Sequence, residues 1–510
     1  MNRRDILQAL GSLALLGAPL GVDFAAAQDS DSQLRLGAPE PFTASTVRDL
    51  AESLSREPFN RRVAELPGEL GNLTYDQYRD IRFRPEASIW RGDGRGFAVD
   101  LLHSGSIFKT PVDIFLVEHG EARQVGYDPN LFTFGPQVPP PPADANLPYS
   151  GFRLRHPLNR PDYMDEFGVF QGASYFRAVA KGQLYGLSAR GLAINTASPK
   201  GEEFPYFRAF WIERPQPESK VIVVYALLDS PSTTGAYRFT LRPGEVTIID
   251  VELTLFPRVE ITHIGFGVLT SMFLFDPTNR NRFDDFRPAV HDNHGLLMWT
   301  GNGEWLWRPL ANPTLLQTSA FLDSNPRGYG LAQRRREFSY YEDTEAHYEL
   351  RPTCWVEPVG DWGKGHVELV EIPTDKEVND NIVVYWRPQQ PVPQKQPFSL
   401  TYRLHWGQEA PRHERLATIE ATRIGLNQTG DKRLFVLDIS NIPELEGAVP
   451  HIGASAGTVS NVVVRPNPDD KTRRVSFELD TADNDLIELS LRMKKGDQSV
   501  SETWLYRWTK

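Results

Sequence analysis

Short apolar runs with a period of two dominate the hydrophobic pattern of this chain and predict β-strands. VDIFLVEHGEARQVGY (112–127) is typical of a hairpin, VIVVYALL (221–228) of a strand buried on both faces, and EVTIIDVELTLF (245–256) of a half-buried strand. The forty prolines and thirty-nine glycines fall between such runs. The pattern therefore predicts a mostly β protein whose main body is a large sandwich of antiparallel sheets.

One helix is predicted near the start of the fold. Val47, Leu50, Ala51 and Leu54 recur at helical spacing behind Ser45-Thr46, which provides a capping residue. Long helical periods do not return later in the sequence.

A proline-rich segment, WRPQQPVPQKQP (386–397), marks the clearest boundary. We place a linker at 389–396, after a large domain that covers 28–388. Six short strand candidates follow the linker: SLTYRLHW, LFVLDI, NVVVRP, RRVSFEL, LIELSLRM and TWLYRW. Their regular spacing predicts a small immunoglobulin-like sandwich over 397–510, whose simplest role is to steady the larger domain.

The first 27 residues have the features of a signal peptide. Arg3-Arg4 precedes an apolar stretch from about Ile6 to Leu20, and an A-x-A cleavage site ends the segment at Ala27. The paired arginines indicate export by the twin-arginine route. The apolar stretch is too short for a stable membrane anchor, and no later segment offers a long uncharged run. We therefore expect an exported protein without a membrane anchor.

Charge and cysteine content narrow the classes of partner. The formal net charge of −11 argues against nucleic acid and anionic membranes, so a neutral ligand is the natural inference. Cys354 is the single cysteine, which excludes an intramolecular disulfide. It lies between Pro352 and Trp355 with no activating base beside it in the sequence, as expected for a small buried hydrophobic residue.

Aromatic and charged residues are concentrated in HDNHGLLMWTGNGEWLWRP (291–309) and the following segments. Five of the eleven tryptophans fall between 299 and 362. Indole rings stack on sugar faces while carboxylates and guanidinium groups bind hydroxyls, so the cluster favours a polysaccharide groove. For any single indole core packing is the better explanation, and only the cluster as a whole favours the groove. The candidate substrate-binding residues are Trp299, Glu304, Trp305, Arg308, Arg351, Trp355, Trp362 and Lys364.

His291 and His294 also have a spacing that a metal site could use. Glycine follows them instead of a helix, and neither cysteine nor a second histidine pair supports the site. A metal is therefore the weaker interpretation. GNGEW (301–305) lacks the phosphate-loop pattern, and we expect no cofactor.

Asp380 is the candidate for acid–base chemistry in EIPTDKEVNDNIVVYW (371–386). It stands between two asparagines at the start of the apolar run IVVYW. Desolvation there would raise its pKa and let it act as a general acid near neutral pH. The alternative is an Asx turn in which Asp380 only caps the strand, and residue type alone favours that turn.

At these residues the chain resembles the osmoregulated periplasmic glucan biosynthesis proteins G and D, over nearly the whole chain after the signal peptide. The motifs that carry the resemblance are GASYFRAV (172–179), LYGLSARGLAI (184–194), YALLDSPSTTGAYRF (225–239), HDNHGLLMWTGNGEWLWRPL (291–310), NPRGYGLAQ (325–333), RPTCWVEP (351–358), WGKGHVELVEIPT (362–374), DNIVVYW (380–386) and SETWLYRW. The twin-arginine leader points towards the D type.

The resemblance implies a mutarotase-like β-sandwich followed by an immunoglobulin-like domain, in the periplasm. It also implies an anomer-inverting glycoside hydrolase that acts internally on β-1,2-glucan. By motif position, Asp380 is the general acid, Asp292 the candidate general base, and Tyr348 a tyrosine near the reacting sugar. Inversion needs carboxyl groups about 6.5–9.5 Å apart or more, with room for water. We expect His291, Asn293 and His294 to keep Asp292 ionised, and Glu304 is the next candidate for the base.

The chain departs from the family pattern after Gly425, where only LNQTGDKR precedes the next strand. Many D-type members carry a long tryptophan-containing loop at that place. A more open cleft would change the acceptor, so an inverting transglycosylase is an alternative to the hydrolase. A non-catalytic glucan-binding protein is the third hypothesis. A homodimer is left open by the sequence.

Overall fold

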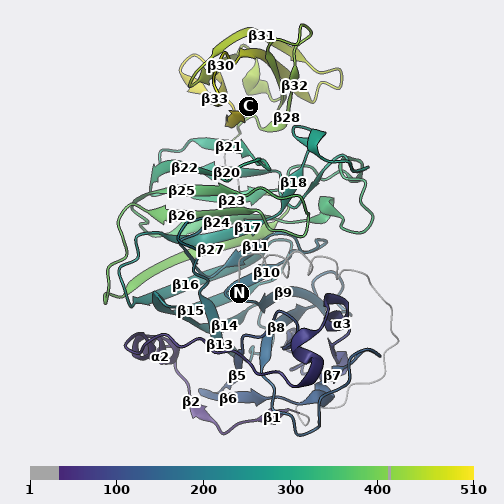
Figure 1. The fold of residues 1–510 in the computed structure, drawn as a ribbon, viewed down its shortest axis with the longest axis vertical. Helices are drawn as coiled ribbons and strands as arrows, with labels where there is room; N and C mark the ends of the chain where they lie inside the picture. The colour runs from purple at the N-terminus through teal and green to yellow at the C-terminus, as the bar shows by residue number, and fades with distance from the viewer. Residues whose placement is uncertain (1–33, 412–414) are drawn as a thin grey trace.

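The computed structural model describes residues 34–411 and 415–510 and is built mainly of β-strands in stacked sheets (Figure 1). The mostly β sandwich predicted from the period-two pattern is confirmed. The signal peptide predicted at 1–27 lies outside the described residues. Within those residues, no helix combines the length and the apolar character needed to cross a membrane.

The first sheet is a long series of paired strands that runs through both ends of the molecule. Two of its pairings are parallel, β5 with β13 and β21 with β35, and the others in the series are antiparallel. In order of pairing the strands are β6 (Glu121–Gly126), β5 (Asp113–Glu118), β13 (Tyr206–Glu213), β14 (Ile222–Asp229), β15 (Thr233–Arg242), β16 (Thr247–Pro257), β27 (Phe398–Gly407), β24 (Thr353–Val359), β23 (Gly328–Ala332), β20 (Gly295–Trp299), β21 (Trp305–Pro309), β35 (Thr503–Thr509), β33 (Leu486–Lys495) and β30 (Val449–Ala454).

The second sheet packs against the first and encloses the main core. Its order is β22 (Gln317–Ser324), β25 (Lys364–Glu371), β26 (Ile382–Pro388), β17 (Ile264–Ser271), β11 (Ser188–Arg190), β10 (Tyr175–Ala178), β9 (Asp165–Gln171), β8 (Tyr149–His156) and β4 (Ala98–His103). Short strands complete the body: β1 (Arg35–Leu36), β2 (Glu40–Pro41), β3 (Arg82–Phe83), β7 (Phe132–Thr133), β12 (Ala193–Ile194), β18 (Phe273–Phe275), β19 (Val290–His291) and β34 (Gln498–Ser499). Inward residues such as Phe152, Phe170 and Phe239 pack between the two sheets.

The predicted elements of the large domain are confirmed. The hairpin over 112–127 is formed by β5 and β6. The run at 221–228 forms β14, which is buried along nearly its whole length, and the run at 245–256 forms the half-buried β16. The free thiol of Cys354 is buried in the core, as expected.

The predicted helix is α2 (Thr46–Ser55), and Ser45 occupies the N-cap position. The Ser45 side chain makes no capping hydrogen bond to any described residue, so that detail of the prediction is wrong. The second helix, α3 (Tyr75–Arg79), is a single short turn with a capping box. Brief 3-10 turns make up the other helical segments: η3 (Gly68–Asn72), η4 (Pro85–Ala87), η5 (Pro129–Leu131), η6 (Arg280–Arg282), η7 (Phe338–Tyr340), η8 (Tyr348–Leu350) and η9 (Pro443–Leu445).

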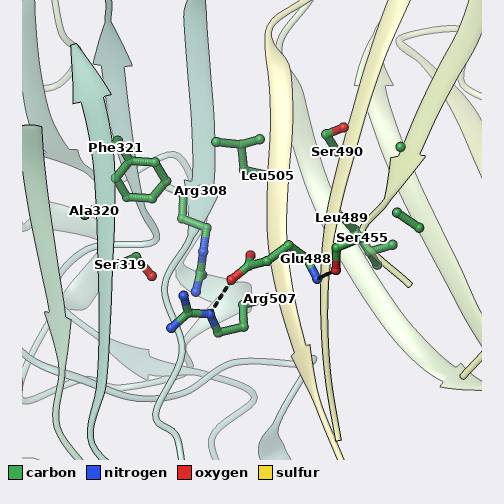
Figure 2. A pocket seen from close by; sticks show the side chains of 12 residues that line it. Arg308, Ser319, Ala320, Phe321, Ser455, Glu488, Leu489, Ser490, Leu505 and Arg507 are labelled. Carbon is green, nitrogen blue, oxygen red and sulfur yellow. Dashed lines mark hydrogen bonds and ion pairs between the residues drawn. The ribbon is translucent and has the colours of Figure 1, made fainter. Parts of the chain in front are cut away.

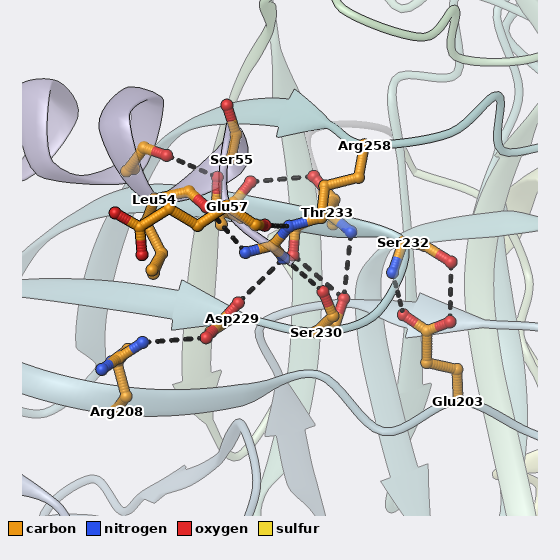
Figure 3. Close-up of polar contacts among 12 residues, drawn as sticks. Leu54, Ser55, Glu57, Glu203, Arg208, Asp229, Ser230, Ser232, Thr233 and Arg258 are labelled. Atoms are coloured by element: carbon orange, nitrogen blue, oxygen red, sulfur yellow. Dashed lines mark hydrogen bonds and ion pairs between the residues drawn. The ribbon is translucent and has the colours of Figure 1, made fainter. Parts of the chain in front are cut away.

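Helix α2 is fixed to the first sheet through a buried arginine–aspartate network (Figure 3). Arg258 donates from Nη2 to Leu54 O over 2.8 Å and from Nε to Glu57 O over 3.0 Å, so it binds carbonyls at and just beyond the helix end. The same guanidinium bonds to Asp229, whose second oxygen accepts from Arg208 over 3.0 Å. Burying Asp229 is tolerated because both of its oxygens are paired with a cation.

The C-terminal part is a small two-layer sandwich. One layer is the four-stranded sheet β28 (Ile419–Leu426), β29 (Arg433–Ser440), β32 (Thr472–Asp480) and β31 (Thr458–Pro466). The other layer is the end of the first sheet, β30, β33 and β35. Residues from both layers, among them Phe435, Phe477 and Trp504, share one core. The two-layer arrangement agrees with the predicted sandwich, and its immunoglobulin-like character stays a prediction.

In the structure, the boundary between the large part and the C-terminal part lies after β27, and the predicted linker lies before this strand. This strand lies between β16 and β24, with Trp406 opposite Thr247 and Gly407 opposite Thr353. SLTYRLHW therefore belongs to the large sheet, and a linker at 389–396 does not separate the two parts. Alternation identifies a strand but carries no information about which sheet it joins, which is why the sequence misplaced it.

The two parts are joined by continuous structure. Leu306 and Trp307 of β21 pair in parallel with Thr503 and Trp504 of β35, so the first sheet crosses the junction without a break. Arg334 of the large part forms two hydrogen bonds of 2.6 and 2.9 Å to Glu502, which is fully buried. A shared sheet and a buried bidentate ion pair hold the two parts in a fixed relation.

Candidate functional site: a buried pair of aspartates

Asp292 is held by the segment that leaves β17. Its backbone N–H donates to Met272 O over 2.9 Å. The adjacent Asn293 accepts a hydrogen bond from Ser271 Oγ over 2.8 Å, and its amide nitrogen donates to Leu331 O and Pro352 O. These bonds fix the backbone on both sides of the Asp292 carboxyl group.

Asp380 is held by the same segment through an equivalent dipeptide. The Asn381 side chain accepts from Phe273 N over 2.8 Å and donates to Phe273 O over 2.9 Å. It also donates to Ile372 O, which closes the entrance to β26. Two Asp-Asn pairs, distant in sequence, are thus tied to the three consecutive residues 271–273. This shared support brings the carboxyl groups of Asp292 and Asp380 into one site.

Both carboxyl groups are buried beside guanidinium groups. Asp380 is 2 % exposed, and its Oδ2 lies 3.8 Å from Nη2 of Arg177. Asp292 is 5 % exposed, and its Oδ1 lies 3.5 Å from Nη1 of Arg351. No described residue donates a hydrogen bond to Oδ2 of Asp380, which leaves that oxygen available for other partners. The site is therefore closed, charged and incompletely hydrogen-bonded.

The environment shifts both acids towards the protonated form. Burial raises the pKa of Asp380 to about 6, opposed by Arg177 and reinforced by the negative charge of Asp292. Burial also raises the pKa of Asp292, opposed by Arg351 and Arg177. The two carboxyl groups are coupled, because a negative charge on one makes ionisation of the other harder, so the pair favours one protonated and one ionised member.

The histidines do not keep Asp292 ionised, contrary to the prediction. Burial lowers the pKa of His291 to about 3, and burial lowers the pKa of His294 well below its usual value. Both rings are neutral near pH 7 and supply no positive charge. The cations that favour the ionised form of Asp292 come from Arg351 and Arg177 instead.

Tyr348 and Arg351 lie at the same site. Tyr348 begins the turn η8, after His347 in a left-handed conformation with φ 46°. The guanidinium carbon of Arg351 lies 5.1 Å from the centre of the Tyr348 ring, and burial raises the pKa of the Tyr348 hydroxyl well above its usual value. Tyr348 therefore stays neutral and can donate a hydrogen bond.

Arg287 connects three segments around the acid pair. Its guanidinium lies 2.8 Å from Asp285, 2.7 Å from Asp343 and 2.8 Å from Glu377. Asp343 precedes Tyr348 by five residues and Glu377 precedes Asp380 by three. A single arginine thus fixes the segments that precede Tyr348 and Asp380 relative to the segment before β19.

Three of the four tryptophans predicted to bind sugar, Trp299, Trp305 and Trp355, lie instead at the junction of the two parts. Trp305 and Trp355 are each 2 % exposed, stack with centroids 5.6 Å apart, and share a core with residues of the C-terminal sandwich. Trp299 stacks on Trp305 at 5.1 Å, and Arg334 covers Trp307 at 3.6 Å. The structure assigns these indoles to packing between the two parts, because their faces are occupied by other side chains.

The remaining substrate-binding candidates make their contacts with other groups. Trp362 is a core residue whose Nε1 donates to Thr401 O. Glu304 accepts from Thr503 at the junction. Lys364 is exposed at the far end of β25, seven steps of about 3.3 Å from Glu371, or roughly 23 Å along the strand. Arg308 is buried against Glu371.

The comparisons with known proteins match this chain over most of its length. The model of the family described as "Periplasmic glucan biosynthesis protein, MdoG" matches residues 42–508. The chain belongs to this family. Among its relatives is glucans biosynthesis protein G of Rhodopseudomonas palustris strain BisA53, 48 % identical over 513 residues and 100 % of both chains. The protein G of Vibrio cholerae serotype O1 strain ATCC 39541 is 49 % identical over 473 residues, 92 % of this chain and 87 % of the relative.

Family membership agrees with the resemblance identified in the sequence, but the leaning towards the D type is not supported. These relatives, and a Bradyrhizobium diazoefficiens protein 48 % identical over 514 residues and 100 % of both chains, carry the G name. The short connection after Gly425 is confirmed: a tight turn over 427–432 joins β28 to β29, with Asn427 N donating to Lys432 O.

The sequence pattern predicted Arg351 near the acids but not Arg177 and Arg190. Arg177 lies on β10 and Arg190 on the neighbouring β11, in the same sheet as β26; β17 separates β11 from β26. Both are nearly fully buried. Each is a single cation inside an apolar motif, GASYFRAV and LYGLSARGLAI, and a buried arginine of that kind needs an acidic partner. That signal could have identified them.

Proposed function

We propose that this protein is a periplasmic glycoside hydrolase that cleaves β-1,2-glucan chains internally, with inversion at the anomeric carbon. The observation that carries the proposal is the pair Asp292 and Asp380, buried together and both shifted towards protonation. Glycoside hydrolysis requires two carboxyl groups in one site, one protonated and one ionised, and a coupled pair can hold one proton between its two members. The family's name connects the chain to periplasmic glucan.

Asp380 acts as the general acid in this proposal. It donates its proton to the glycosidic oxygen as the bond to the departing glucose unit breaks. Its pKa of about 6 lies close enough to neutrality for the proton to be both present and transferable. Arg177, 3.8 Å away, stabilises the carboxylate that remains after the transfer.

Asp292 acts as the general base. It accepts a proton from the attacking water, directly or through an intervening hydroxyl, on the opposite face of the sugar. Arg351 favours the ionised carboxylate that this role requires. Tyr348, neutral and adjacent to Arg351, is suited to bind a hydroxyl of the reacting sugar.

The test is incubation of the purified protein with linear β-1,2-glucan. Products are separated by length, and proton NMR follows the anomer of the first reducing ends. We expect shorter linear chains whose new reducing ends appear as the α anomer before mutarotation. Asp380→Asn is the matched inactive control, and a linear β-1,3-glucan tests linkage specificity. New ends of the β anomer would contradict inversion, and an unchanged polymer would contradict the enzyme and leave a glucan-binding protein.

An inverting transglycosylase is the second candidate. The burial of Asp292 and Asp380 supports it, because limited access for bulk water favours a sugar hydroxyl as the acceptor. Cyclic or rearranged chains in the same incubation, instead of shorter linear ones, would establish transfer.

Export to the periplasm is proposed from the leader. Arg3-Arg4, the apolar stretch and the A-x-A site form a twin-arginine signal. We expect Arg3→Lys together with Arg4→Lys to retain the protein in the cytoplasmic fraction. Continued export through the general secretory route would show that export does not require recognition of the arginine pair.

A further inference from the structure

We infer that a cavity at the junction of the two parts is a second, non-catalytic binding site for a segment of neutral glucan. Its volume is about 500 Å³. It lies between the edge strand β22 of the large part and strands β30, β33 and β35 (Figure 2). The identity of the ligand rests on the proposed function, whereas the existence of a site there rests on the cavity itself.

The cavity offers the groups that bind sugars. Figure 2 shows Phe321 on the β22 wall and Glu488 on the opposite wall, with Arg308 and Arg507 between them. Phe321 packs against the main core and is partly exposed, so the part of its side chain that lines the cavity can contact a sugar face. The serine hydroxyls at 319, 455 and 490 complete the lining with groups that both donate and accept hydrogen bonds.

The charged groups are fixed before any ligand arrives. Arg507 Nε donates to Glu488 over 2.6 Å, and its Nη1 reaches Thr318 O of the edge strand over 3.3 Å. Arg308 donates from Nη2 to Glu371 over 3.0 Å and from Nη1 to Pro309 O. A site whose polar groups are already positioned loses little conformational entropy on binding.

The balance of charge selects a neutral ligand. Two guanidinium groups, from Arg308 and Arg507, are matched by two carboxylates, from Glu371 and Glu488. A phosphate or another anion would find no unmatched positive charge there. Hydroxyl groups, which donate and accept, suit such a mixed lining, as does a stacking ring.

The cavity is structurally connected to the catalytic region. Glu371, which holds Arg308, pairs across the sheet with Ile382 at the start of β26. Ile382 follows Asp380 by two residues. The cavity and the acid pair therefore lie towards the same end of the β25–β26 hairpin. A long chain bound in the cavity would be held close to the protein while another segment occupies the catalytic site, which raises the local substrate concentration.

The test uses calorimetry in the Asp380→Asn background, where substrate is not consumed. A β-1,2-linked glucose tetrasaccharide is the probe. We expect two molecules bound per chain in this background, and one after either Phe321→Ala or Ser490→Trp, the second of which fills the cavity. For the long polymer we expect about fivefold weaker binding with Phe321→Ala, the loss of one stacking contact.

Leu322→Ala is the matched control. Leu322 neighbours Phe321 on β22 but points to the other face and is 85 % exposed, so the stoichiometry should stay at two. Unchanged melting temperatures exclude misfolding of Ser490→Trp as the cause of a loss. One bound tetrasaccharide in the parent, insensitive to both cavity variants, would overturn the second site while leaving the proposed function intact. Absence of any glucan binding would overturn both.

Discussion

Residues 291–309 contribute to two regions of the molecule, the acid pair and the core at the junction. Both regions are buried, but the energetic consequence of burial differs between them. The first four residues of this stretch place Asp292 in the acid pair, where desolvation raises a carboxyl pKa and costs stability. The last residues place Trp305 and Trp307 in the core at the junction, where burial of apolar surface stabilises the fold. Low exposure alone therefore does not distinguish a functional site from a core. The chemical identity of the buried group does.

The comparison predicts opposite effects of substitution in the two regions. Removing a buried acid should eliminate catalysis and raise stability, since the site carries an energetic cost for its function. Removing a buried indole should lower stability and leave the chemistry intact.

The largest effect is expected for Asp380→Asn. An amide cannot protonate the leaving oxygen, so kcat on linear β-1,2-glucan should fall by about 10²- to 10⁴-fold, while glucan affinity changes little. Product chromatography gives the rate and calorimetry gives the affinity. Cleavage at nearly the parent rate would make Asp380 only a strand-capping residue.

A comparable loss of hydrolysis is expected for Asp292→Asn, again about 10²- to 10⁴-fold, with binding retained. Azide needs no base, so adding it should restore part of the turnover and yield a glycosyl azide of inverted configuration. NMR of the product identifies it. If affinity falls as much as rate, Asp292 binds sugar and the base has to be sought elsewhere. Glu304 lies at the junction and is not a suitable replacement.

Trp305→Ala should destabilise the protein by about 3–5 kcal/mol, because it leaves a cavity between two packed sheets. Chemical denaturation measures the change in unfolding free energy. At temperatures where the variant is folded, kcat should stay within about twofold of the parent. A selective loss of glucan affinity without loss of stability would instead show that Trp305 binds the substrate.

Asp380→Asn should also raise stability, by up to about 3 kcal/mol at pH 7. The folded pKa of Asp380, about 6, lies above its value of about 3.9 in an unfolded chain. The parent is therefore most stable below about pH 4 with respect to this group, and it loses stability as pH rises towards 6. Denaturation from pH 4 to 7 should show the advantage of the variant growing over that window. An advantage that does not vary with pH would exclude this cause.

The smallest effect concerns pH. The general acid has to be protonated, so kcat/KM should fall about tenfold per pH unit above about 6, where Asp380 loses its proton in the free enzyme. A pH–rate profile measures this limb. Arg177→Met, which removes the nearest cation, should move the limb to higher pH, whereas loss of Arg214, which pairs with Asp93 and Glu118 at a distant surface, should leave it in place.

The sequence by itself determined the strands and the helix, whereas the assignment of Asp292 and Asp380 as acids of a site came from the family motifs. Alternation of apolar residues is a local property, and β14 and β16 follow from it directly. The position of Asp380 beside an apolar run likewise indicated its raised pKa, because a run of apolar residues is expected to be buried and burial disfavours the charged carboxylate.

Only the tertiary structure decided which residues meet. The segment 271–273 brings Asp292 and Asp380 together through bonds to Asn293 and Asn381, and none of these pairings is local in sequence. The placement of β27 within the large sheet and the packing of Trp305 against the C-terminal sandwich also depend on contacts between residues that are distant in sequence. Indole burial is favourable in any apolar environment, so composition could not distinguish a sugar groove from a junction. That distinction required knowing which surface covers the ring.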